Sequence, residues 1–213
     1  AHGLNCIVKP GPFILAEYRA AGLPDWFMNT YQSEIKMRNS KGEIFPSDGV
    51  SLFNKIYLQK VTLWYDKIMP LISEHQISAG GPIIMMQVCN EIGVFSWLAH
   101  QGDYCGAVKV RFIDYLSKKF KNIGIINDLW GTDYSDFSHI ELPPDGKLPY
   151  TSKSDRGRDY EWHCFWRVYY GDYLRMLSRM ARERGVTVPF YHNLPGWIYG
   201  SGYEFPVNIT MYE

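Results

Sequence analysis

The sequence has no excess of charge of either sign. It carries 22 Lys and Arg residues against 22 Asp and Glu residues, and no block of basic residues stands out. A chain without a net positive field is not drawn to nucleic acid or to an anionic membrane surface. We therefore expect neither as a partner, and a neutral ligand fits this charge balance best.

Long apolar segments are also missing. No apolar run approaches the ~20 residues that a membrane-spanning helix requires, and the chain does not open with a charged segment followed by an apolar one, as a secretory leader does. The sequence therefore predicts no membrane span. A leader that precedes Ala1 stays open as an alternative.

Metal and disulfide patterns are absent as well. The four cysteines, Cys6, Cys89, Cys105 and Cys164, have no CxxC spacing and lie in or beside apolar segments, which is typical of buried free thiols. The histidines have no spacing that suits a metal site. We expect no metal and no cofactor. Free thiols favour a reducing compartment such as the cytoplasm, although the sequence does not determine the compartment.

Apolar and aromatic residues are plentiful. With 213 residues, of which 46% are hydrophobic, the chain is long enough for one substantial core, and we treat residues 1–213 as one domain. Aromatic residues make up 16% of the sequence. Large aromatic side chains mostly pack in cores, but their rings also stack on sugar faces, so both uses stay open.

Short apolar runs alternate with helical patterns along the chain. Residues 82–88 form a continuous apolar run without alternation, as expected for a strand covered on both faces of a parallel sheet. Further strands are expected at 4–8, 186–191 and 207–212. Helices are expected at 51–75, 108–120 and 162–184, with Gly185 ending the last one and a long loop at 131–158. Pro70 should kink or end the first helix.

This alternation predicts an α/β fold with a parallel sheet and right-handed crossovers. No GxGxxG or phosphate-binding loop follows a strand, which counts against an open nucleotide-binding sheet and favours a barrel. In a (β/α)₈ barrel the chemistry lies at the carboxyl ends of the strands. Polar residues follow the expected strands at those ends.

Asn90 and Glu91 directly follow the apolar run. A carboxyl group in an apolar wall has a raised pKa, which suits a general acid. Glycoside hydrolysis needs one carboxyl group to protonate the leaving oxygen, and a retaining enzyme needs a second one about 5 Å away. An Asn-Glu pair alone is a weak signal, because most such pairs only cap a strand or form a surface turn.

Two longer segments resemble a known family. Residues 80–93, GGPIIMMQVCNEIG, are similar to the segment GGPIIMVQVENEYG of family 35 glycoside hydrolases, which include β-galactosidases. Residues 9–18, KPGPFILAEY, and 22–26, GLPDW, resemble that family's RPGPYICAEW and GGLPAWL. Residues 129–132 and the prolines at 143–144 are similar to family 42 β-galactosidases. Both families belong to one clan of (β/α)₈ barrels.

The resemblance implies a retaining β-galactosidase that acts by double displacement on a β-galactoside or a related oligosaccharide. Glu91 is then the acid/base, Asn90 binds the sugar beside it, and Ile14, Ala16 and Glu17 line the galactose subsite. Without the resemblance, the favoured interpretation of Glu17 is a carboxylate that caps or salt-bridges its own loop; the resemblance favours binding. Cys89 departs from the family, since it replaces the first glutamate of the ENE motif and removes a charge. Lys9 replaces an arginine and Ile92 a tyrosine.

By the same resemblance the chain covers about strands 3 to 6 of a partial barrel. The family's nucleophilic glutamate follows strand seven and has no clear counterpart, so we expect it outside this chain. Glu213 is the one late candidate for that role. The rest of the barrel, or a second copy of the chain, would then be the partner.

Four further candidates follow the expected strands. His192 and Asn193 follow the fifth strand, where Asn193 is a candidate substrate contact and His192 could instead be satisfied by backbone groups. Trp97 and Trp130 are candidate sugar platforms, with simple packing equally open. Alternative functions are another β-glycosidase of the same clan and a carbohydrate-binding protein without activity, since the nucleophile is missing.

Overall fold

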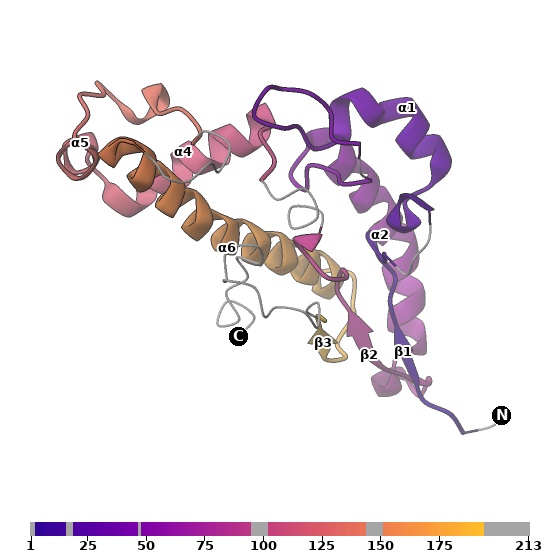
Figure 1. The fold of residues 1–213 in the computed structure, drawn as a ribbon. Coiled ribbons are helices and arrows are strands. Elements are labelled where there is room, and N and C mark those ends of the chain that lie inside the picture. The colour runs from indigo at the N-terminus through magenta and orange to yellow at the C-terminus, as the bar shows by residue number, and fades with distance from the viewer. Residues whose placement is uncertain (1–2, 16–18, 47, 95–101, 144–150, 194–213) are drawn as a thin grey trace.

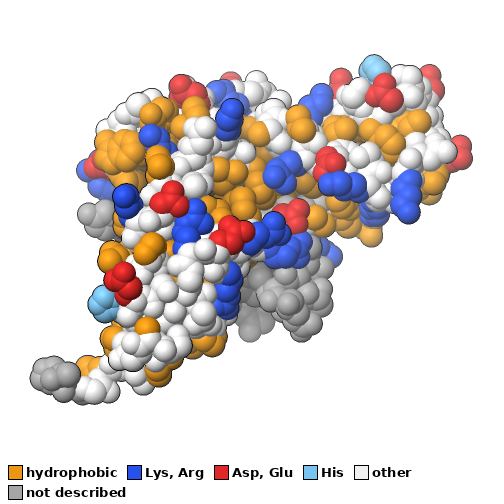
Figure 2. All heavy atoms as spheres, turned by 180° about the vertical axis from the view of Figure 1, so that it is seen from behind, with side chains coloured by type: hydrophobic (Ala, Val, Ile, Leu, Met, Phe, Trp, Pro, Cys, Tyr) orange, Lys and Arg blue, Asp and Glu red, His pale blue; other side chains and the backbone are white. Residues whose placement is uncertain are grey.

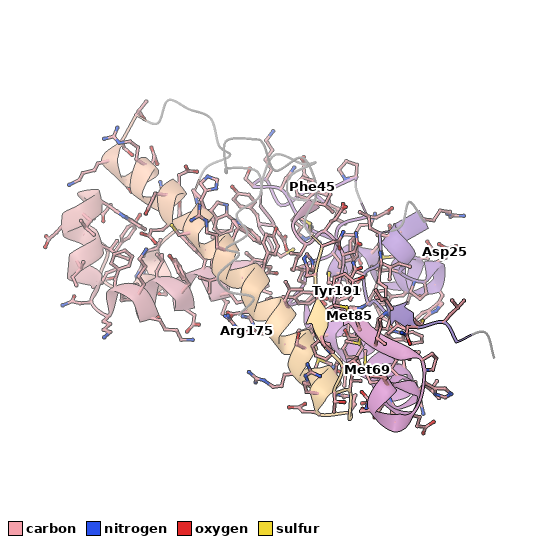
Figure 3. The ribbon with its side chains drawn as sticks, turned by 90° about the horizontal axis from the view of Figure 1, so that it is seen from below. Asp25, Phe45, Met69, Met85, Arg175 and Tyr191 are labelled. Carbon is pink, nitrogen blue, oxygen red and sulfur yellow. The ribbon has the colours of Figure 1, made fainter. Side chains whose placement is uncertain are left out.

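The computed structural model describes residues 3–15, 19–46, 48–94, 102–143 and 151–193. Its centre is a parallel sheet of β1 (Cys6–Val8), β2 (Ile83–Gln87) and β3 (Phe190–Tyr191), in the order β1-β2-β3. The register places Gln87 opposite Tyr191, so the carboxyl ends of the strands lie together (Figure 1). Met85 and Tyr191 lie on neighbouring strands near the middle of the molecule in Figure 3. The expected strands at 4–8 and 82–88 are thus confirmed, each slightly shorter than predicted.

Helix α2 (Lys55–His75) follows β1 and packs along the sheet. It begins at Asn54, whose side chain accepts hydrogen bonds from the amides of Ile56 and Tyr57, as a good N-terminal cap does. Its buried residues recur every three or four positions and face the core. They are Tyr57, Val61, Tyr65, Met69 and Ile72.

We predicted that Pro70 would either kink α2 or end it. The helix does not end there, because it continues to His75. Proline has no N–H to donate, so one hydrogen bond of the helix is missing at this point. The neighbouring Met69 is fully buried and Ile72 nearly so. Burial of these two side chains on either side of Pro70 favours continuing the helix.

Helix α6 (Lys153–Arg182) carries the chain back to the sheet, and Figure 1 shows it running from β3 to the far end of the molecule. It begins well before residue 162, where we expected it, so the predicted loop at 131–158 is too long. The Ser152 hydroxyl accepts a hydrogen bond from the amide of Asp155 at 2.9 Å, which caps the helix at this earlier position. The short helix η3 (Phe137–His139) also lies within the expected loop.

Several elements were not predicted. Helix α1 (Asp25–Ile35) begins after Pro24, and α5 (Ile123–Trp130) begins at the capping residue Asn122 and ends at Gly131, which is left-handed. Both are short, and a pattern over so few residues resembles any apolar run. The expected helix at 108–120 is confirmed as α4 (Gly106–Phe120). The remaining turns are η1 (Arg19–Gly22) and η2 (Ile77–Ala79).

Strand β3 is much shorter than the predicted strand at 186–191. The Arg182 guanidinium donates to the carbonyls of Val186 and Val188, at 2.8 and 2.9 Å, so a side chain occupies these two groups. Pro189 has no N–H to pair with a neighbouring strand. The Pro189 carbonyl still accepts the Met86 amide at 3.0 Å, so the run joins the sheet only from Pro189 onward. The expected strand at 207–212 lies outside the described residues.

The core is strongly aromatic, as the packing alternative predicted. Tyr57 and Tyr173 are buried and share a hydrogen bond of 2.7 Å between their hydroxyl groups. A second group of rings joins α4 to α6, with Phe112, Trp162, Phe165 and Trp166 in contact. The four cysteines are free thiols, but Cys6 is exposed, because it lies at the open edge of the sheet.

Candidate functional site

Polar side chains from all three strands meet where the strands end. Asn90 is buried, and its Oδ1 accepts one hydrogen bond from Lys9 Nζ and one from Gln87 Nε2, both at 2.9 Å. Gln87 Nε2 also lies 2.5 Å from Asn193 Oδ1, which follows β3. The structure therefore brings Asn90 and Asn193 into one network. Because the Asn90 oxygen is occupied, its amide nitrogen is the group left to donate to a ligand.

Glu91 lies in a tight turn that follows this network. Cys89 has a φ of 63° and Glu91 a φ of 40°, which are left-handed conformations that side chains rarely adopt. Each such residue costs on the order of 1–3 kcal/mol and persists only where its surroundings hold it. Strained residues of this kind cluster at functional sites.

Four hydrogen bonds hold the turn. Gln87 Nε2 shares its two hydrogens among three acceptors, the Cys89 carbonyl at 3.1 Å and the side-chain oxygens of Asn90 and Asn193. Lys9 also donates to the Asn90 side chain, and the Ile92 amide donates to His192 Nε2 at 3.3 Å. These contacts come from β2 itself, from the residue after β1 and from the residue after β3. The position of Glu91 thus depends on the register of the whole sheet.

Cys89 is a residue of the turn, and its thiol is neutral. Burial raises the pKa of the Cys89 thiol to about 12, an effect that the Asn90 backbone and the Lys9 charge partly oppose. A protonated thiol therefore stands where the related family has a glutamate. The negative charge that this glutamate would place beside Asn90 and Glu91 is absent here.

Glu91 lines a cavity of ≈ 40 Å³ together with Asp103, Trp166, Tyr169 and others. Such a space holds a water molecule, whereas ligand pockets usually measure about 300–1,000 Å³. The Asp103 carboxylate accepts hydrogen bonds from the amides of Arg38 and Cys105 at 3.1 and 3.0 Å. A second carboxylate, which is buried, thus lies on the wall of this cavity beside the half-buried Glu91.

The remaining candidates are placed as follows. Ile14 lines a separate groove of ≈ 620 Å³ between the loop after β1, the start of α1 and the first half of α2, and Glu91 is not part of that groove. On the face seen in Figure 2, hydrophobic side chains gather over this region, which includes the exposed Trp26 and Trp64. Ala16, Glu17, Trp97 and Glu213 lie outside the described residues.

Trp130 is not presented to a ligand, because only 4% of its surface is exposed. It ends α5, which packs on α6 at the opposite end from β3 (Figure 1). A Cβ on Gly157 of α6 would lie 2.3 Å from the Trp130 ring, so the indole is packed directly onto the helix backbone. The structure favours packing over the sugar-platform role that we predicted as an alternative.

Sequence reasoning missed the roles of Gln87 and Lys9, and it left open that of His192. Gln87 is the one polar residue within β2, which is a signal that could have been used. The contact of His192 with Ile92 has no local signal, because 100 residues separate the two.

The buried imidazole of His192 predicts a loss of stability in acid. Burial lowers the pKa of His192 from 6.5 to about 4. The unfolded chain therefore takes up the proton first, so this contribution to stability is complete above about pH 6.5 and falls until about pH 4. The fall should reach at most about 3 kcal/mol, because the ring keeps some contact with solvent.

Urea unfolding between pH 4 and 7 measures this effect. Other groups also titrate in this range, so the wild type is compared with His192→Gln, in which the drop attributable to this imidazole should disappear. His75→Gln, at an exposed position, is the matched control and should follow the wild type. A His192→Gln curve parallel to that of the wild type would contradict the prediction.

The model of glycosyl hydrolases family 35 matches residues 1–129. A β-1,2-glucosyltransferase of Ignavibacterium album is 39% identical over 99% of this chain, which spans 29% of that protein. The β-galactosidase of Bos taurus is 34% identical over 54% of this chain and 15% of its own length. The chain thus spans less than a third of these curated relatives.

Solved structures share the fold. A β-galactosidase from the haloarchaeon Halorubrum lacusprofundi superposes with a TM-score of 0.67 at 16% identity, over 88% of this chain and 32% of that one. The described part of the chain therefore has the fold of a segment of a (β/α)₈ glycoside hydrolase barrel. None of its described helices is long and apolar enough to cross a membrane.

Proposed function

Because the chain belongs to glycosyl hydrolases family 35, we propose that the full-length protein processes terminal β-glycosides by a retaining double displacement, with Glu91 as the acid/base. One observation carries the proposal. The Asn90-Glu91 pair stands at the carboxyl end of the middle strand, in a strained turn held from all three strands. Strain maintained by so many contacts is typical of a functional residue.

The reaction then proceeds in two steps. Glu91 gives its proton to the glycosidic oxygen while a second carboxylate attacks the anomeric carbon and forms a glycosyl-enzyme. Glu91, now ionised, removes a proton from the incoming hydroxyl group, which displaces the carboxylate and restores the β configuration. The Asn90 amide nitrogen donates to a hydroxyl group of the sugar. We place the second carboxylate outside the described residues, with Glu213 as a candidate within this sequence.

The remainder of the full-length chain supplies the other strands in this proposal, with the described strands standing as about the third, fourth and fifth of the barrel. Asn193, at the end of β3, lies beside Asn90 through Gln87 and is a further candidate sugar contact. Glu17 and Ala16 keep their proposed place in the sugar subsite by resemblance. Ile14 is tied to the site through its carbonyl, which lies 3.4 Å from Lys9 Nζ.

Two sugars compete for the first subsite. A β-galactoside is supported by the motif around Glu17 and by the likeness to mammalian β-galactosidase. A β-glucoside is supported by the glucosyltransferase, whose likeness extends over 99% of this chain. That relative also favours a sugar hydroxyl over water as the acceptor in the second step. Hydrolysis of β-galactosides and transfer of β-glucosyl groups are therefore the two candidate activities.

Product analysis separates these candidates. We expect the full-length protein to release nitrophenol from one of the two nitrophenyl glycosides, β-galactoside or β-glucoside, with a β-configured first product by NMR. Added glucose or a β-glucoside acceptor should yield a longer saccharide if the enzyme transfers, and only free sugar if it hydrolyses. An α-configured first product, or binding of sugar without turnover, would overturn the retaining mechanism.

A further inference from the structure

The backbone around Glu91 leaves the sheet abruptly. The last ladder bond of β2 runs from the Val88 amide to the Tyr191 carbonyl at 2.9 Å. Immediately beyond it, Cys89 and Glu91 have left-handed conformations. A segment without the hydrogen bonds of the sheet can adopt several backbone conformations. Rare conformations such as these persist only where other contacts hold them.

His192 makes such a contact from the neighbouring strand. Its Nε2 accepts the hydrogen of the Ile92 amide at 3.3 Å. A backbone N–H can only donate, so Nε2 must carry its lone pair, and the imidazole is neutral with its hydrogen on Nδ1. The ring reaches residue 92 because Gln87 is paired with Tyr191, which places His192 beside the start of the turn.

We propose that His192 is a positioning residue for the acid/base, because its neutral Nε2 holds the Ile92 amide and thereby fixes the direction in which Glu91 presents its carboxyl group. The inference rests on the proposed function of Glu91 and adds a second residue to the same site. Glu91 and Ile92 share one peptide unit, so a hydrogen bond at the Ile92 nitrogen restricts the rotation that would swing Glu91 away.

The geometry distinguishes this role from the substrate contact that the sequence left open. A substrate contact would need a ring nitrogen to face the sugar, but Nε2 is engaged with the backbone and Nδ1 is buried. Asn193 completes the arrangement on the other side of the turn, since its Oδ1 accepts from Gln87 at 2.5 Å, and Gln87 also donates to the Cys89 carbonyl. Two successive residues after β3 therefore brace the acid/base turn from opposite ends.

The test compares substrates that need acid assistance with substrates that do not. In the full-length protein, His192→Phe keeps a flat ring but removes the acceptor. We expect kcat/KM on a β-linked disaccharide or an alkyl glycoside to fall about 10–100-fold, because a misdirected acid loses much of its effect. On a dinitrophenyl glycoside of the same sugar, whose leaving group needs no proton, the loss in the first step should stay within about threefold.

A second variant separates positioning from simple structural support. The side-chain carbonyl of His192→Gln can accept the Ile92 amide hydrogen, so this variant should recover activity on the disaccharide to within about fivefold of the wild type. Hydrogen exchange of residues 88–94 should rise in the Phe variant and stay near the wild type in the Gln variant. If the Phe variant does not fold, the shorter His192→Asn replaces it with the same expected pattern.

Each outcome has a definite meaning. Equal losses on both substrates in the Phe variant, or no recovery with Gln, would show that His192 only supports the fold, and the inference would be wrong. Glu91→Gln is measured beside these variants. If Glu91→Gln itself shows no dependence on the leaving group, the acid/base assignment fails and the proposed function falls with it. His75→Phe, at an exposed position on α2, should match the wild type throughout.

Discussion

Glu91→Gln in the full-length enzyme should reduce kcat on a disaccharide by about 10²–10⁴-fold, the usual contribution of a general acid. The amide keeps the size of the side chain but has no proton to give to the leaving oxygen. The departing sugar must then leave as an alkoxide, which raises the barrier of the first step. The turn should stay in place, because its contacts with Lys9, Gln87 and His192 do not involve the Glu91 carboxyl group.

Rates on a series of aryl glycosides check this expectation. The loss should shrink as the pKa of the leaving phenol falls, and the second step should become limiting for the best leaving groups, since Glu91 also serves there as the base. Glu74→Gln, an exposed position on α2, is the matched control and should behave as the wild type. A small loss that is the same for all leaving groups would contradict the assignment of Glu91.

Phe112→Ala should lower the free energy of unfolding by about 3–5 kcal/mol, the range for removing a buried phenylalanine ring. Phe112 is fully buried on α4, and its ring centroid lies 5.1 Å from that of Trp162 and 5.5 Å from that of Phe165. The substitution leaves a cavity that rigid neighbouring rings cannot fill. The activity of each folded molecule should change little, because these rings pack between α4 and α6 rather than at the ends of the strands.

Denaturant unfolding followed by tryptophan fluorescence measures the loss. The control is Val110→Ala on the same helix, where 68% of the side chain is exposed and the change should stay within about 0.5 kcal/mol. If both variants lost similar stability, the rings of α4 and α6 would not form the core described here. If Phe112→Ala instead weakened sugar binding with normal stability, the sugar-platform alternative would apply to this cluster.

Elements with strong local patterns were predicted well. The apolar run of β2, the stripe of α2 and the amphipathic α4 were each found near their expected positions, because burial imposes a period on the sequence over enough residues. The start of α6 was placed too late, because the apolar pattern does not reveal the cap that Ser152 and Asp155 form. A serine followed three residues later by an acidic residue is itself a signal of a helix start, and it could have been used. The beginning of β3 was placed too early, because Arg182 binds the carbonyls of Val186 and Val188, which is a tertiary contact.

Some features of the candidate site could likewise be predicted from the sequence, and others could not. The place of Asn90 and Glu91 at a strand end follows from the apolar run before them, and their chemistry came from the family resemblance. The left-handed turn and its braces could not be predicted, since they depend on the pairing of Gln87 with Tyr191. Trp130 was a candidate sugar platform, but the short helix α5, which was not predicted, carries it into the core.

Helix α6 has 30 residues and, at about 1.5 Å per residue, a length of about 45 Å. Its last turns are anchored beside the sheet through Arg182, while α5 packs against it far from the strands. The region between β2 and β3 can therefore gain or lose residues at its outer end without moving Asn193 relative to Gln87. In evolutionary terms, we expect this part of the chain to diversify its outer contacts freely, because the helix separates such changes from the turn that holds Glu91.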